Sequence, residues 1–212
     1  MIKDAVMNII DCIWPMIVIV ITILSSIRIS HIIKHHKKIK IYEELIHLCF
    51  IIYILSLFYL VTFQDVNYGT NNFTLFKEMF RYEFGSRLFI KNVLGNILLF
   101  VPLGFFISFY TKSKKIFCPL ILTFLASLTI EFTQVKIGRV FDVDDIILNG
   151  IGGLFGYLFY KFGNQLPKFM RSTWFLNVIS IIMVVLFTLY LLFVYGVIDI
   201  RLGGYFELLW NN

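Results

Sequence analysis

The sequence predicts an all-α integral membrane protein, a polytopic bundle of about six transmembrane helices in a single domain over residues 1–212. Composition carries this prediction, because 59% of the residues are hydrophobic and only 15% are charged. Soluble domains are about 45–50% apolar and about 25% charged. A chain of this size cannot bury so much apolar surface in one water-soluble core, so a soluble enzyme, a disordered chain and a nucleic-acid-binding module are excluded.

Six apolar runs have about the length that a membrane-spanning helix requires, which is about 20 residues. They cover residues 8–29, 45–63, 92–110, 116–135, 145–160 and 174–197. The first run is longer than the apolar part of a signal peptide and no small-residue cleavage site follows it, so we expect a retained helix. The fifth run is short and rich in glycine.

Basic residues favour one orientation of these spans. The loops after the first, third and fifth runs hold 11 of the 19 Lys and Arg residues and only two acidic residues, Glu43 and Glu44. Cytoplasmic loops of membrane proteins carry an excess of Lys and Arg. We therefore expect these loops in the cytoplasm of a bacterium and both termini outside its plasma membrane.

The longest loop, residues 64–91, has phenylalanines at helical spacing. Phe73, Phe76, Phe80 and Phe84 follow one another at i, i+3, i+7 and i+11, with charged residues on the other faces. This pattern is typical of an amphipathic helix that lies in the membrane interface. The sequence thus predicts an outer interfacial helix, with an ordinary packed loop as the alternative.

Polar residues inside apolar runs are costly and therefore informative. They gather at the outer ends of the third to fifth runs: Asn96, Glu131, Gln134, Arg139, Asp142, Asp145 and Asn149. Glu131 must be protonated, reach the interface or be paired, and Arg139 is its natural partner or that of Asp142. Each position also has a plain structural explanation as a helix cap or an ion pair.

Small residues and one proline mark the helix contacts. Gly152 and Gly156 extend the face of Asp145 and Asn149, and such spacing lets another helix approach closely. The third run contains Pro102 and Gly104, and the proline predicts a kink or break near Leu98. Because a glycine stripe can pack within a chain or between chains, a homo-oligomer stays open.

No familiar catalytic motif or metal-ligand cluster is present in the sequence, and no cofactor is expected. Asp142 and Asp145 are the candidates for holding a divalent cation, since such ions prefer carboxylate oxygens. Glu131 is the candidate general base, although no recognisable nucleophile accompanies it.

The spacing Asn96-x3-Phe100-x-Pro102-x-Gly104, Glu131-x2-Gln134 and Arg139-x2-Asp142-x2-Asp145-x3-Asn149-x2-Gly152 resembles the VanZ-like family over about residues 60–160. The helices expected at about 8–29 and 174–197 lie outside this core. Relatives carry Pro-Phe in the long outer loop, where this chain has Leu75-Phe76.

The resemblance implies a membrane protein that contributes to teicoplanin resistance, with less lipidated glycopeptide bound at the cell surface. Its partners would be the lipid bilayer and a lipidated glycopeptide or lipid-linked cell-wall precursor. Two alternatives stay open: a membrane-embedded hydrolase or transferase acting on an envelope lipid or peptide, and a small transporter. A polar cluster near one face argues against transport, which needs a path across the membrane.

Overall fold

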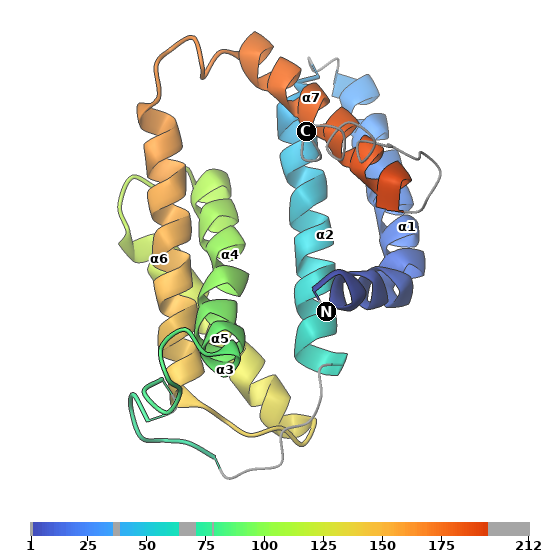
Figure 1. Ribbon diagram of the computed structural model, residues 1–212. Helices are drawn as coiled ribbons and strands as arrows, with labels where there is room; N and C mark the ends of the chain where they lie inside the picture. The colour runs from blue at the N-terminus through green and yellow to red at the C-terminus, as the bar shows by residue number, and fades with distance from the viewer. Residues whose placement is uncertain (1, 36–38, 64–70, 78, 195–212) are drawn as a thin grey trace, which may run out of the picture. The chain divides into compact units, whose positions relative to one another are not determined.

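The computed structural model describes residues 2–35, 39–63, 71–77 and 79–194 (Figure 1). Its helices are α1 (Ile2–His35), α2 (Ile41–Phe63), α3 (Arg87–Phe89), the π-helical turn η1 (Ile90–Leu94), α4 (Gly95–Thr111), α5 (Phe117–Lys136), α6 (Val143–Gln165) and α7 (Thr173–Val194). Each expected apolar run forms a helix, apart from residues 195–197, which lie outside the described residues, and no strand forms within the described ranges. The all-α prediction is confirmed.

Four helical segments are long and apolar enough to cross a membrane: Trp14–His35, Ile41–Thr62, Arg87–Thr111 and Phe117–Lys136. The apolar part of α7, Thr173–Leu189, is shorter. Helix α6 is not among these segments, and it begins with two aspartates and contains several glycines. The chain is therefore a multi-pass membrane protein, with α6 as its least apolar long helix.

Contacts divide the chain into two compact units. One comprises residues 1–37 and 47–166, and the other comprises residues 38–46 and 167–212. In the second unit, the side-chain oxygen of Asn177 on α7 accepts a hydrogen bond from the backbone N–H of Tyr42 at 3.1 Å. Asn177 thereby caps the start of α2, where N–H groups have no partner within the helix.

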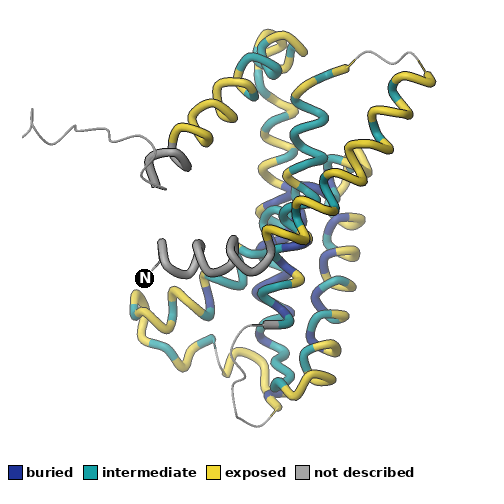
Figure 2. The backbone as a smooth tube through the Cα atoms, turned by 90° about the vertical axis from the view of Figure 1, so that its right-hand side faces the viewer, coloured by how far each residue is buried: buried dark blue, intermediate teal, exposed yellow. Residues whose placement is uncertain are grey.

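Helices α4, α5 and α6 form the core of the first unit, and buried residues concentrate on them (Figure 2). Glycines bring α4 and α6 into backbone contact. A Cβ atom at Gly104 would overlap the carbonyl of Gly153, and one at Gly156 would overlap the carbonyl of Val101. Only glycine permits this approach, as is typical of helix packing in membranes.

The buried face of α5 is mostly polar rather than apolar. Pro119, Thr123, Ser127 and Glu131 follow one another every four residues and are all buried. The large apolar side chains of the same helix are exposed: Phe117, Ile121, Leu122, Phe124, Leu125, Phe132 and Val135. This arrangement suits a helix that is surrounded by lipid and keeps its polar groups toward its neighbours.

The third apolar run is irregular at its start and not at its centre. Helix α4 stays helical through Leu98 and Pro102, so the chain does not break near Leu98, and a kink there stays a prediction. The irregular turn is η1, which precedes α4. The hydroxyl of Tyr53 on α2 donates to the carbonyl of Leu99 at 3.0 Å and supplements the backbone hydrogen bonds just before the proline.

The predicted outer interfacial helix is wrong. The described residues between 71 and 86 form turns, with Phe76 in the left-handed region at a φ of 65°. Backbone N–H groups of this segment bind the side chain of Asp144, which is 65 or more residues away, instead of carbonyls four residues back. The phenylalanine spacing is real, but a distant carboxylate takes the hydrogen bonds that a helix would need.

Candidate functional site

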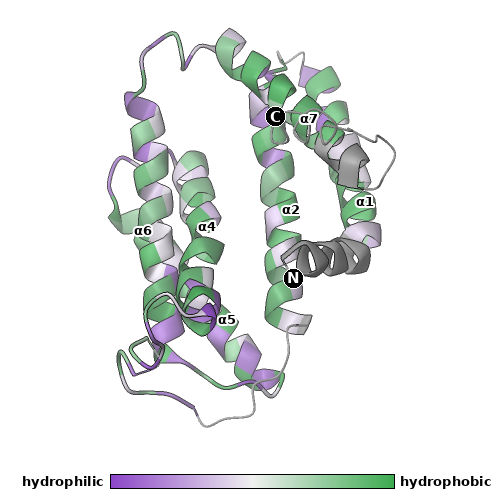
Figure 3. Ribbon diagram, viewed as in Figure 1, coloured by the Kyte–Doolittle hydropathy of each residue, from purple (hydrophilic) through white to green (hydrophobic). Residues whose placement is uncertain are grey.

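The polar residues of the core gather at one end of α4, α5 and α6, where Figure 3 shows hydrophilic colour at the start of α6. We call this group the polar cluster; its members are Asn72, Asn96, Glu131, Gln134, Arg139, Asp142, Asp144 and Asp145. They come from the start of α4, the end of α5, the turn that follows it, the start of α6 and the loop before α3. Five separate segments therefore meet at one end of the bundle.

A two-way backbone contact joins the loop before α3 to the start of α6. The N–H of Asn72 donates to the carbonyl of Phe141 at 2.8 Å, and the N–H of Val143 donates to the carbonyl of Asn72 at 3.1 Å. The side-chain amide of Asn72 also donates to Asp142 Oδ1 at 2.9 Å. Asn72 is buried, so these bonds are shielded from water.

Asp142 and Asp144 hold the backbone around them. Asp142 is the N-cap of α6 and accepts from the N–H of Asp144 at 2.9 Å. Asp144 is only 1% exposed, and its two oxygens accept from the N–H groups of Phe76 at 2.6 Å and Met79 at 3.2 Å. The capping explanation suits Asp142, whereas a solvated turn does not describe Asp144.

Glu131 is the centre of the network on α5. It is 2% exposed, and its Oε2 accepts from the N–H of Asp142 at 3.0 Å. In the amide orientation that satisfies both neighbours, Gln134 donates to Glu131 Oε1 at 3.1 Å and accepts from Arg139 Nη1 at 3.2 Å. Gln134 thus connects the predicted pair of Glu131 and Arg139.

Arg139 also reaches helix α2. Its Nη1 donates to the carbonyl of Val61 at 3.1 Å, in the last turn of that helix. Carbonyls at a helix C-terminus lack partners within the helix, and a cation there is favourable. Both hydrogen bonds found for this guanidinium among the described residues use Nη1. Its Nε and Nη2 are then the donors that a bound anion would meet.

Asn96 and Asp145 link α4 to α6. The Asn96 amide donates to Asp145 Oδ1 at 2.5 Å. Asp145 as a whole residue is half-buried, whereas Glu131 and Asp144 are buried. Asn149 lies one turn further along α6 and faces α5 instead, where its amide donates to Ser127 Oγ at 2.9 Å. The polar face of α6 that was predicted from the sequence therefore contacts two helices, α4 through Asp145 and α5 through Asn149.

No group of three or more His, Cys, Asp or Glu residues in the described part of the chain is arranged to hold a metal ion. The candidate ligand Asp142 already accepts hydrogen bonds from Asn72 and Asp144, and Asp145 accepts from Asn96.

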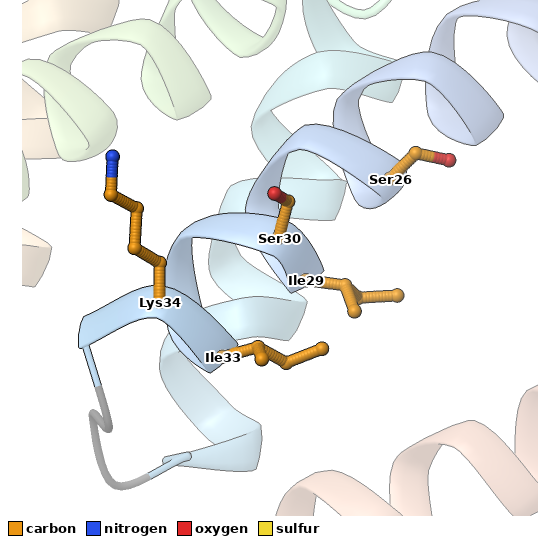
Figure 4. A pocket seen from close by; sticks show the side chains of 5 residues that line it. All are labelled: Ser26, Ile29, Ser30, Ile33 and Lys34. Atoms are coloured by element: carbon orange, nitrogen blue, oxygen red, sulfur yellow. The ribbon is translucent and has the colours of Figure 1, made fainter.

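A surface hollow of about 540 Å³ lies elsewhere, along the last turns of α1 (Figure 4). It is lined by Ser26, Ile29, Ser30, Ile33 and Lys34. All five belong to one helix, and none belongs to the polar cluster. A hollow formed by a single helix does not enclose a ligand, so the polar cluster is the better candidate site.

Three residues of this network were not predicted from the sequence as site residues: Asn72, Ser127 and Asp144. Asp144 has a signal, since it sits between two other acids at a helix start, but its burial is a tertiary property. Asn72 and Ser127 have none, because isolated Asn and Ser residues are common in loops and membrane helices.

Comparison with known families gives a match. The VanZ/LLP1 family profile matches residues 13–164, which is well over half of the chain. The matched region begins within α1, includes α2 to α5 and ends one residue before the end of α6. The match extends further toward the N-terminus than the core of about residues 60–160 expected from the motifs. No match was found among curated proteins or among solved structures. The chain belongs to the VanZ/LLP1 family.

Proposed function

We propose that this protein lowers the binding of teicoplanin and other lipidated glycopeptides at the outer face of a bacterial plasma membrane. The observation that carries the proposal is the polar cluster, which joins three packed helices and an aromatic loop at one end of the bundle. Lipidated glycopeptides and lipid-linked cell-wall precursors meet the membrane in the same interfacial layer. The family name supports the link to glycopeptide resistance.

The burial and hydrogen bonding of the carboxylates in the polar cluster favour ligand binding over catalysis. Glu131 and Asp144 each accept at least two hydrogen bonds from described residues, and both are buried. A general base must reach the proton that it removes, and Glu131 is enclosed by its own partners. Among the described residues, no hydrogen-bond partner is found for Nε and Nη2 of Arg139 or for Oδ2 of the half-buried Asp145. We therefore assign ligand contact to these two and a scaffold role to Glu131.

Antibiotic susceptibility of a sensitive Gram-positive host tests the proposal. We would express the wild type, Arg139→Gln and Asp145→Asn, and measure inhibition by teicoplanin and by vancomycin, which lacks the acyl tail. Arg171→Gln serves as a matched control, because Arg171 is an exposed arginine that follows α6 and lies outside the polar cluster. We expect the wild type and the control to raise the teicoplanin inhibitory concentration alone, and both cluster variants to lose most of this effect.

Protein amount in the membrane must be equal in all strains. Full resistance in the double variant Arg139→Gln/Asp145→Asn would contradict the assigned contacts. Equal protection against both antibiotics would contradict the role of the acyl tail, and a well-expressed wild type without effect would overturn the proposed function itself.

A further inference from the structure

Among the described residues of the first compact unit, the most exposed aromatic side chains lie within residues 71–91. Phe73, Phe80 and Phe84 are 72%, 79% and 92% exposed, and Phe76 and Leu88 are exposed as well. A protein in water would bury such side chains or use them for contact. Their density over one short segment indicates that something apolar covers them.

The backbone of this segment is fixed by hydrogen bonds to the start of α6, so its exposed side chains do not result from a loose loop. Asp144 binds the N–H groups of Phe76 and Met79, and Asn72 is joined to the start of α6. Phe73 stacks on Phe141, with ring centroids 5.4 Å apart. The loop backbone is therefore shaped before anything binds, which lowers the ordering cost of binding.

Membrane spans place this segment at a membrane surface. One candidate span ends at Thr62, and the next begins at Arg87. The intervening residues must return to the same face of the membrane from which the next span starts. Aromatic side chains are enriched at that depth, where rings contact acyl chains and polar groups contact headgroups.

Exposed cations accompany the aromatic rings. Lys77, Arg87 and Lys91 are all exposed, and they flank Phe80 and Phe84 in the sequence. The exposed Glu83 is the one described acidic residue from 71 to 91, so the described part of the segment has a positive net charge. Phosphate-bearing lipid headgroups attract such cations close to a membrane surface.

We propose that residues 71–91 form a preformed docking surface for anionic phospholipid headgroups, with the phenylalanines inserted among the acyl chains and Lys77, Arg87 and Lys91 on the phosphates. The bound molecules are anionic phospholipids of the surrounding membrane leaflet, which become enriched around this loop. The proposal does not depend on glycopeptide resistance, because it concerns the resident lipid and not the antibiotic.

Fluorescence quenching in lipid nanodiscs tests it. Trp14, Trp174 and Trp210 are replaced by Phe, and Phe80→Trp provides the probe. Nanodiscs contain phosphatidylcholine with a minor share of phosphatidylglycerol, and bromine is placed on the acyl chains of one lipid or the other. Leu98→Trp is the matched probe, since Leu98 is exposed on α4 within the next span.

We expect the loop probe to be quenched by both lipids, and by brominated phosphatidylglycerol severalfold beyond its share of the bilayer. The α4 probe should follow bulk lipid composition. The triple variant Lys77→Gln/Arg87→Gln/Lys91→Gln should lose the preference, by about fivefold for each removed cation near the surface. The control triple Lys112→Gln/Lys114→Gln/Lys115→Gln, which removes three exposed cations after α4, should keep the preference.

Absence of quenching at the loop probe would overturn insertion. Quenching that follows bulk composition in the wild-type loop would overturn headgroup recognition. A preference for phosphatidylglycerol that persists in the loop triple variant would overturn it as well. Each result is read by fluorescence of purified protein, so a failure of the resistance assay leaves this test unaffected.

Discussion

Each buried carboxylate of the polar cluster accepts hydrogen bonds from backbone N–H groups outside its own helix turn. Glu131 accepts from Asp142, and Asp144 accepts from Phe76 and Met79. A buried N–H without a partner costs about 1–3 kcal/mol. These side chains therefore stabilise the turn before α6 and the loop before α3, and their removal should act on stability before it acts on binding.

Substitution of Glu131 tests this residue-scale role. Glu131→Leu leaves the N–H of Asp142 unpaired, so we expect a loss of about 1–3 kcal/mol in the free energy of unfolding. Glu131→Gln retains one acceptor and should cost about 1 kcal/mol. Denaturant titration in mixed micelles measures both, with the exposed Glu83→Gln as a control that should stay within about 0.5 kcal/mol. A Leu variant as stable as the control would contradict the scaffold role.

At the scale of elements, the contact between α4 and α6 depends on glycine. A Cβ atom at Gly156 would overlap the backbone of Val101, whereas one at Gly150 on the same helix would meet nothing within 4 Å. We expect Gly156→Ala to lower the free energy of unfolding by about 1–3 kcal/mol through overpacking. Gly150→Ala should raise it by about 0.5–1 kcal/mol, because alanine favours a helix interior. The same mixed-micelle titration measures both; equal effects would contradict close approach at this stripe.

A second prediction at this scale concerns how much the Asn177 cap stabilises the start of α2. Asn177→Ala removes the acceptor for the N–H of Tyr42, which should cost about 0.5–2 kcal/mol. Hydrogen exchange should rise at the first turn of α2 and not in α5. The control Asn164→Ala removes an exposed amide that contacts only its own helix at the carbonyl of Tyr160. Unchanged exchange at Tyr42 would show that the cap is not formed.

At the scale of the whole molecule, charge placement predicts which face of the membrane each loop occupies. With the native cysteines Cys12, Cys49 and Cys118 replaced by serine, Lys114→Cys should react with an impermeant maleimide only in inside-out vesicles. Glu83→Cys should react on intact cells, because the exposed Glu83 belongs to the loop at the opposite end of α4. The reverse labelling would place the polar cluster in the cytoplasm and contradict the proposed function.

The positions of the six long helices could be predicted, because about 20 consecutive apolar residues have few alternatives to a helix in a bilayer. The polar residues that meet at one end could also be predicted, since they stand out against apolar surroundings. Arg139 beside Glu131 followed from charge, although Gln134 completes the contact. The local pattern could not show that residues 73–84 do not form a helix, because the hydrogen bond from the N–H of Phe76 goes to the distant side chain of Asp144.

The sequence by itself determined the membrane class, the helix positions and the candidate residues, because length and hydropathy are local properties. Tertiary structure decided which carboxylates are buried acceptors and which remain available, and it decided the conformation of the loop before α3. The physical reason is that a hydrogen bond between Asn72 and Asp142, 70 residues apart, is invisible to any local pattern.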